Sequence, residues 1–403
     1  MPTLNRVGAS FICVLACAAT GRAQELTESQ LVDLIVRDGV QARAIRLDVE
    51  VVRREQAARV MLSNPSIAYT REGAGFTEFL QAEQFLPIFG SRGALMRAGA
   101  AAMQVAEAGR DGRLWQLRGD AQAFVARLLA EQEKVNASTI TLREVERIIA
   151  LLRIREDEGE GSRFDRLRAE QELADARQIA LDAAASAAEV RAGIAAVVTD
   201  GARIARVAGT LYVERPLPGV EALIERALKT RGELRALTAA SERFRLEADA
   251  ARRAKMPAPT VIGGLKRADG ASGRESGGLL GINVTLPLFD SGRRDAARWL
   301  AERDRTEAER AMTVQNIRAQ VAATSEVLAL RQDAARAFDT AAPAGELAQI
   351  AEVSYTEGEA GILELLDAHR TAARARIRTI DMRLAARLAQ IALERAVGDT
   401  IWP

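Results

Sequence analysis

The sequence has few of the residues that catalytic and metal sites use. Among 403 residues there is one histidine, His369, and two cysteines, Cys13 and Cys17. One imidazole without further ligands makes no metal site, and a Ser/His/Asp or Cys/His nucleophile is not expected. The glycine pairs at 263–264 and 277–278 are not followed by the Lys-Ser/Thr of a phosphate-binding loop. We therefore expect no enzymatic activity, no cofactor and no resident metal.

Aromatic residues and net charge are also scarce. Phe, Trp and Tyr make up 4% of the chain, which is little for filling a wide globular core. Acidic and basic residues nearly cancel, 55 against 56, so no nucleic-acid partner is indicated. Ala, Leu, Glu and Arg dominate instead, and this composition is typical of long helices packed side by side.

The N-terminus resembles a secretory signal. Arg6 precedes an apolar stretch at 7–19 that is too short to span a bilayer, and cleavage after Ala23 follows from the small residues there. An alternative interpretation makes Cys17 the lipidated first residue of a lipoprotein. Both cysteines lie in this segment, so the mature chain is expected to have no internal disulfide. No later stretch reaches 18 uninterrupted apolar residues, and no transmembrane helix is expected.

The chain contains an internal repeat. Three pairs of matching segments occur in the same order at nearly constant offset: 64–67 with 258–261, 86–91 with 286–291, and 158–167 with 357–366. Such self-similarity indicates that one structural unit is present twice. We therefore divide the chain into a signal peptide (1–23), a first repeat (24–210) and a second repeat (211–403).

Each repeat has the same expected elements. These are a helix (27–61 and 218–255), two strands (65–72 with 78–87, and 259–267 with 278–287), a very long helix (92–156 and 292–356) and a return helix (162–199 and 361–396). A polar loop from Asp269 to Gly278 is expected to lengthen the second hairpin. Breaks or kinks are expected within the long helices at their glycines and proline: Gly109, Gly112, Gly119, Pro343 and Gly345.

The strand from Leu280 to Leu286 shows the clearest alternation. Leu280, Ile282, Val284 and Leu286 alternate with small or polar residues, as in a membrane barrel strand with an apolar lipid face. An ordinary half-buried hairpin would show the same pattern. If the barrel interpretation holds, four strands cannot close alone, because lipid cannot pair the open edges. Trimers would supply twelve strands, an even number.

These features resemble the TolC family of outer-membrane efflux channels. The resemblance lies in the twofold element order, in the motif at 286–292, and in Tyr355–Gly358 leading into Leu365–Ala368. It implies a mainly α chain with a small β part, in which coiled-coil hairpins form a long helical barrel below a trimeric 12-stranded transmembrane β-barrel. The segment 86–92 is similar to the subgroup that serves heavy-metal cation efflux.

The resemblance also implies location and partners. The homotrimer would lie in outer-membrane lipid, extend into the periplasm, and dock through a periplasmic adaptor protein on an inner-membrane efflux pump. It would be a passive conduit for export.

Two parts of the chain become candidate sites through this resemblance. Asp165, Arg168, Glu364 and Asp367 match positions at the periplasmic tip, where charged side chains form the pore constriction. A nearby Arg would pair with the carboxylates and hold the tip closed; without the resemblance, all four are ordinary solvated charges. The short turns at Gly159 and Gly358 are the expected adaptor contact.

Two other functions remain open from the sequence. A periplasmic adaptor has about this length, but it normally carries one coiled-coil hairpin between β-rich halves. A structural coiled-coil envelope protein would explain the helices, but not the duplicated junctions at 86–91 and 286–291.

Overall fold

A computed structural model describes residues 24–73, 76–198, 204–286, 288–289, 291–341 and 344–402. The predicted signal peptide and Cys17 lie outside this part of the chain. The first half contains β1 (Gln24–Thr27), α1 (Glu28–Asp38), α2 (Val40–Arg59), β2 (Ser66–Glu72), β3 (Thr77–Phe85), α3 (Ser91–Asp157), α4 (Arg163–Val197) and β4 (Ile204–Ala208). The second contains α5 (Val220–Thr230), α6 (Gly232–Arg252), the 3-10 turn η2 (Arg253–Lys255), β5 (Ala258–Gly270), β6 (Gly273–Thr285), α7 (Arg293–Ala341), α8 (Ala344–Thr356) and α9 (Ile362–Val397).

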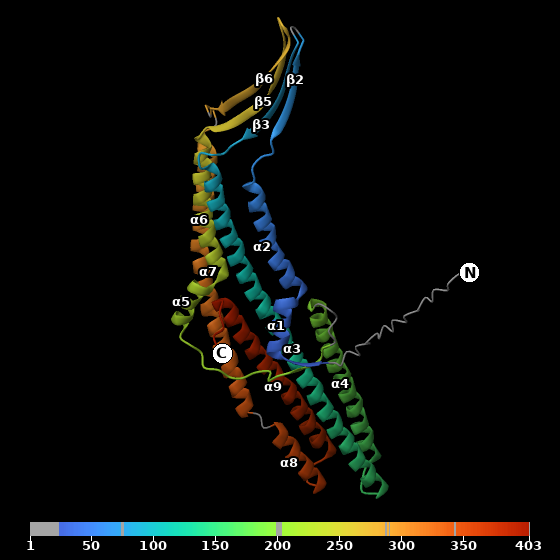
Figure 1. Ribbon diagram of the computed structural model, residues 1–403. Coiled ribbons are helices and arrows are strands. Elements are labelled where there is room, and N and C mark those ends of the chain that lie inside the picture. Colours follow the sequence, from blue (N-terminus) through green and yellow to red (C-terminus); the bar gives the residue numbers. More distant parts are fainter. Residues whose placement is uncertain are drawn as a thin grey trace, which may run out of the picture.

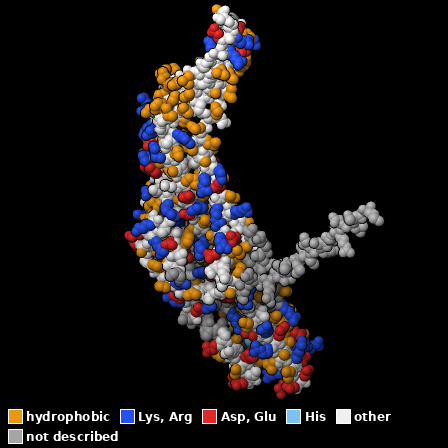
Figure 2. All heavy atoms as spheres, in the orientation of Figure 1, with side chains coloured by type: hydrophobic (Ala, Val, Ile, Leu, Met, Phe, Trp, Pro, Cys, Tyr) orange, Lys and Arg blue, Asp and Glu red, His pale blue; other side chains and the backbone are white. Residues whose placement is uncertain are grey.

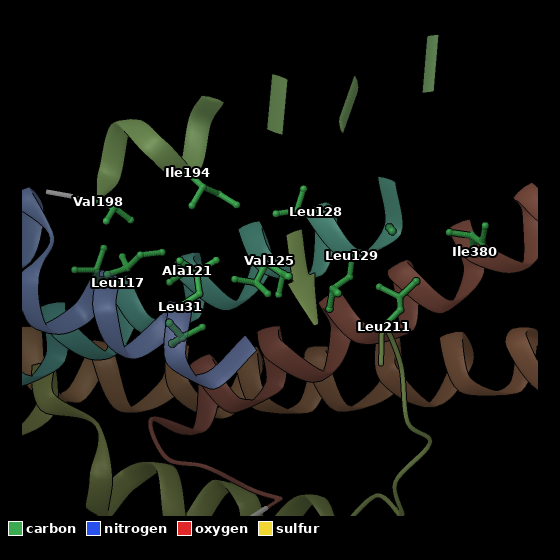
Figure 3. Packing of buried hydrophobic residues seen from close by; sticks show 14 of the residues in the cluster. Leu31, Leu117, Ala121, Val125, Leu128, Leu129, Ile194, Val198, Leu211 and Ile380 are labelled. Atoms are coloured by element: carbon green, nitrogen blue, oxygen red, sulfur yellow. The ribbon is translucent and has the colours of Figure 1, made fainter. Parts of the chain in front are cut away.

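The molecule is elongated, with the sheet at one end and the helical turns at the other (Figure 1). The helices lie side by side along most of its length. The core therefore consists of small and branched side chains between helices rather than one wide centre. One such cluster, at mid-height, joins Leu31 of α1, Val125 and Leu128 of α3, and Ile194 of α4 (Figure 3).

The first helix of each repeat is divided, contrary to the prediction of single helices at 27–61 and 218–255. Thr27 and Gln30 form a capping box at the start of α1, and Gly39 ends that helix in extended backbone. A Cβ at Gly39 would lie 2.3 Å from the Ile35 carbonyl oxygen. In the second repeat α5 ends at Thr230 and α6 begins at Gly232, with Arg231 in non-helical backbone between them.

The breaks predicted in the first long helix are absent. The helix α3 is continuous over 67 residues and passes through Gly109, Gly112 and Gly119. Gly112 instead allows a close approach, because a Cβ built on Gly232 of α6 would lie 2.7 Å from the Gly112 Cα. In the second repeat α7 and α8 are separate helices on either side of residues 342–343. Pro343 itself lies outside the described residues, and Gly345 lies within α8.

The sheet has four antiparallel strands in the order β2–β3–β5–β6. Its central pair, β3 and β5, joins the two repeats. The strands β5 and β6 pair as far as Gly270 and Gly273, so the expected loop from Asp269 to Gly278 is mostly strand. The strands β2 and β6 are the two edges of this sheet.

A second, two-stranded sheet was not predicted. The strand β1 pairs in parallel with β4, so the start of the first repeat is tied to its end. Within the described ranges, no helix combines the length and the apolar character that crossing a membrane would require.

Candidate functional site: the helical turns and the sheet

The two turns at the end remote from the sheet have the same local structure. Gly159 and Gly358 have φ values of +77° and +79°, which favour glycine. In the first turn the N–H groups of Glu160 and Gly161 both donate to the Arg155 carbonyl oxygen, at 2.9 and 2.8 Å. In the second, residues 359 and 360 donate in the same way to Ser354, at 2.8 and 3.1 Å.

Both turn glycines are open on the outside. A Cβ at either Gly159 or Gly358 would meet no atom within 4 Å. The constraint on these positions in one protomer is therefore the backbone conformation and not local crowding.

The four predicted constriction residues lie in the first two turns of α4 and α9. Asp165 is half-buried, whereas Arg168, Glu364 and Asp367 are exposed. Glu364 also has a local role: its Oε2 accepts a hydrogen bond from the Gly361 N–H at 2.8 Å and so caps α9. The carboxylate of Asp367 contributes to raising the pKa of Arg370, although Glu172 is the larger cause.

The pairing expected for Arg168 is not present within the protomer. Among the residues that the structure describes, no ion pair joins Arg168 to Asp165, Glu364 or Asp367. Its neighbour Arg166 is the paired cation instead, with Glu156 at 2.6 Å and Glu170 at 2.9 Å. These bonds stabilise the first hairpin internally, since Glu156 lies on α3 and Glu170 on α4.

Contacts between the two hairpins were missed by the sequence reasoning. Arg370 of α9 binds Glu172 of α4 at 2.5 Å, and this contact raises the pKa of Arg370. Arg376 of α9 donates two hydrogen bonds of 2.7 Å to Glu144 of α3. Each partner is more than 190 residues from the other in sequence, so no local spacing could reveal the pairs.

An apolar cluster lies between these polar contacts and the turns. Leu365 and Leu366 of α9 are 0% and 3% exposed, and they pack with Val145, Ile149 and Leu152 of α3. The guanidinium of Arg155 lies over the Tyr355 ring, 5.2 Å from its centroid, and so joins α3 to α8. The two hairpins are therefore fastened together near the tip by both apolar and charged contacts.

The sheet has one face that is predominantly apolar. Register places alternate residues of all four strands on that face. It includes Ile67, Tyr69, Leu80, Val261, Leu265, Leu280 and Ile282. Leu280 is 83% exposed and Ile282 is 70% exposed, which is unusual for large apolar side chains.

The opposite face carries mostly smaller and more polar residues, although Phe79, Ile262 and Leu279 also lie on it. Thr70, Gln81, Gly264 and Asn283 point to that side. Figure 2 shows hydrophobic side chains over the part of the sheet nearest the helices and charged side chains at its far tip. The alternation predicted for 280–286 therefore extends to all four strands, but not to the far tip of the sheet.

Comparison with known proteins identifies the second half of the chain. The family model described as "Outer membrane efflux protein" matches residues 223–399. This part of the chain is therefore similar to the outer membrane efflux proteins. The predicted resemblance to the outer-membrane efflux channels is confirmed, whereas the heavy-metal subgroup stays a prediction. No curated protein sequence matches the chain.

Solved structures share the fold over nearly the whole length. A membrane protein from Pseudomonas aeruginosa has a TM-score of 0.72 and 21% identity, with 98% of this chain and 99% of that chain covered. The Neisseria gonorrhoeae MtrE outer membrane channel has a TM-score of 0.70 and 18% identity, with coverages of 95% and 93%. For the Campylobacter jejuni CmeC outer membrane channel the values are 0.71 and 13%, with 100% and 96% covered. The first repeat therefore has the efflux-channel fold as well.

Proposed function

We propose that the protein is one protomer of a homotrimeric outer-membrane channel that carries exported compounds passively across the periplasm and the outer membrane. The main evidence for this proposal is the sheet, because one of its faces is apolar and exposed across all four strands. Such a face is suited to lipid, and the smaller, more polar face is suited to a water-filled lumen. The efflux family of residues 223–399 supports the same function, and the protein is not an enzyme.

Trimeric assembly follows from the edges of the sheet. In lipid, unpaired N–H and C=O groups on β2 and β6 would each be costly. If β6 of one protomer pairs with β2 of the next, the edges disappear and the strand directions keep alternating. Three copies of four strands give a barrel of about twelve strands, an even number like those of outer-membrane barrels.

The long helices supply the second part of the conduit. At about 1.5 Å per residue, the 67 residues of α3 span roughly 100 Å. Three protomers would place their long helices around one axis and continue the barrel as a helical tube. An adaptor and an inner-membrane pump are the proposed partners at the far end, where both turns lie.

The face assignment and the trimer can be tested with paired cysteines. The predicted mature sequence has no cysteine, so introduced thiols would be the only ones. Tyr69→Cys on β2 should be combined in turn with Gly278→Cys, Leu280→Cys and Ile282→Cys on β6, all on the apolar face. The matched control replaces Thr70, the lumenal neighbour of Tyr69, in the same three combinations.

The expected result is oxidation of at least one Tyr69→Cys pair to covalent trimers, with no trimer from the Thr70→Cys series. Neighbouring strands bring residues of the same face together, whereas residues of opposite faces point apart. Equal cross-linking in both series would refute the face assignment. A monomeric, water-soluble protein would refute the channel.

We also propose that Glu364 and Asp367 narrow the pore at the tip. Their exposure in the protomer supports this, because rings of three carboxylates around an axis would attract cations. The double variant Glu364→Gln/Asp367→Asn retains a side chain that can cap α9 at Gly361. The variant Arg168→Ala tests the role of the positive charge at the tip.

Planar-bilayer recordings at low ionic strength give the measurement, because salt at 1 M shortens the Debye length to about 3 Å. The double variant should lose cation selectivity and block by multivalent cations. Arg168→Ala should raise the resting conductance if this cation restrains the tip of a neighbouring protomer. If selectivity and block are unchanged in the double variant, these carboxylates are solvated surface charges.

A further inference from the structure

The single histidine of the chain is buried near the tip without a hydrogen-bond partner among the described residues. His369 of α9 is 6% exposed, and both ring nitrogens are inaccessible and lack a hydrogen bond. An unsatisfied buried polar group costs about 1–3 kcal/mol. The packed arrangement is thus unfavourable for this side chain, and any arrangement that admits water or a partner would relieve it.

Charged groups from three helices face the imidazole. The closest is Glu144 of α3, whose Oε2 lies 3.9 Å from Nδ1. The same oxygen already accepts a 2.7 Å hydrogen bond from Arg376, which lies on α9 with His369. A second pair, Arg147 of α3 with Glu352 of α8 at 3.9 Å, acts at longer range.

The imidazole has space on one side. A cavity of about 460 Å³ between α3, α4 and α9 is lined by His369 together with Ser138, Thr141 and Leu366. The ion pair of Glu172 on α4 with Arg370 on α9 also lines it. A modest movement of α9 would therefore expose the ring nitrogens to this cavity and its water.

Burial disfavours the charged form of the ring. It lowers the pKa of His369 below its ordinary value, and the nearby Glu144 offsets the effect only in part. The packed tip therefore binds a proton less tightly than a loosened tip in which the imidazole is solvated. Because a ligand shifts a conformational equilibrium by its differential affinity, protons favour the loosened state.

We propose that His369 makes the channel tip sensitive to acid: the buried site stabilises the protonated imidazole poorly, so protonation favours a loosened packing of α9 on α3 in which water reaches the ring. The inference rests on the proposed channel function for its consequence, which is an open pore at low pH. The proton comes from solvent, and no covalent bond changes. In the loosened tip the charged ring is hydrated by the water of the neighbouring cavity.

The size of the effect follows from linkage. With an ordinary pKa of about 6.5 in the loosened tip, each pH unit below that value favours loosening by up to about tenfold per protomer. This holds until the pH reaches the lower pKa of the packed form. If three tips open together, the factors multiply, so one pH unit would change the equilibrium by up to about a thousandfold.

Two carboxyl groups in the described part of the chain are competing sensors. Desolvation raises the pKa of Glu133 in α3 and of Glu394 in α9, which moves their titration toward that of a histidine. Neither is among the groups that shift the pKa of His369. The variants Glu133→Gln and Glu394→Gln are therefore matched controls for His369→Gln, which keeps a polar side chain but cannot titrate between pH 5 and 8.

The first experiment follows the imidazole directly. In protein labelled with ¹⁵N only at histidine, the one imidazole gives one set of NMR signals, and its titration needs no channel activity. We expect a neutral ring at pH 7, with protonation delayed below the ordinary range and accompanied by faster hydrogen exchange in α8 and α9. Titration at the ordinary value, or unchanged exchange, would overturn the proposal.

The second experiment records conductance at pH 7.5 and 5.5. Wild type, Glu133→Gln and Glu394→Gln should open on acidification, whereas His369→Gln should not. An equal response in His369→Gln would overturn the sensor and leave the channel intact. Absence of conductance in every protein at both pH values would instead refute the proposed function, and the NMR titration would still decide the state of His369. Should His369→Gln fail to assemble, His369→Asn provides the second non-titrating variant.

Discussion

The close contact between Gly112 and Gly232 predicts a sharp difference among three glycine-to-alanine variants. A Cβ on Gly232 would lie 2.7 Å from both the Cα and the N of Gly112 and 2.9 Å from the Ala108 carbonyl oxygen. Ordinary contacts between carbon atoms begin at about 3.5 Å. Since the obstructing atoms belong to the α3 backbone, α3 and α6 would have to separate by most of an ångström.

Gly109 and Gly112 provide the matched comparison. A Cβ on Gly109 would meet nothing within 4 Å, and a Cβ on Gly112 would come no closer than 3.5 Å to the backbone of α6. Replacing glycine by alanine inside a helix gains about 0.5–1 kcal/mol. Overpacking a well-packed contact costs about 1–3 kcal/mol. We therefore expect Gly109→Ala and Gly112→Ala to stabilise the protein and Gly232→Ala to destabilise it.

The assay is thermal unfolding of the detergent-solubilised protein, monitored by circular dichroism. Electrophoresis of heated samples gives the temperature at which the assembly dissociates. Each change occurs three times in a trimer, so small differences per protomer add up. The unfolding temperatures of Gly109→Ala and Gly112→Ala should be higher than that of wild type, and that of Gly232→Ala should be lower. If Gly232→Ala is as stable as Gly109→Ala, the helices do not approach as closely as the structure shows.

Three further results are expected. Glu247 is 1% exposed and pairs with Arg59, so Arg59→Met should lower the free energy of unfolding by about 3–5 kcal/mol, because it leaves a buried carboxylate without its cation. Chemical denaturation measures this loss. If the double variant Arg59→Met/Glu247→Leu regains stability, the loss came from the broken ion pair and not from packing. The mass of the mature protein should correspond to cleavage after Ala23, whereas a mass beginning with diacylglyceryl-modified Cys17 would establish the lipoprotein. A bulky residue at Gly358, where φ is +79°, should reduce efflux while channel levels and trimers stay normal; unchanged efflux would argue against an adaptor contact at this turn.

Much of the fold could be predicted because the two repeats constrain each other. The strands at 66–72 and 77–85 are individually short, but their counterparts in the second half share the same flanking motifs. The turn glycines were predictable for the same reason, since Gly159 and Gly358 occupy matching positions and both adopt positive φ. The repeat boundaries at 210 and 211 stay predictions.

The errors have a common physical origin. Helix propensity alone predicts that a glycine destabilises a helix. Gly112, however, lies where the backbones of α3 and α6 are in contact, and this tertiary contact outweighs the local preference. Gly39, by contrast, does end a helix, because its extended backbone turns the chain. One sequence cannot distinguish these two uses of glycine, since the difference lies in a partner helix far away in the chain.

The tip shows the same limit for charged residues. Glu364 and Asp367 lie on the exposed side of α9, and their role at the constriction stays a prediction. The motif gave no indication of the pairs that fasten this helix to α3 and α4. Those pairs depend on the packing of two hairpins. The buried state of His369 was equally hidden, because its sequence neighbourhood is that of an ordinary amphipathic helix.

The second long helix, α7, has exposed apolar side chains that point beyond a single protomer. Its contacts within the protomer are with α5, α6 and α9. In α7, large apolar residues such as Met312, Val327 and Leu330 remain 60%, 47% and 62% exposed. Val327 and Leu330 are three residues apart and therefore lie next to each other on one face of the helix. The strand β6, one of the two open edges of the sheet, leads directly into α7, so one neighbouring protomer would cover both. The exposed side of α7 therefore supports the same assembly as the unpaired strand.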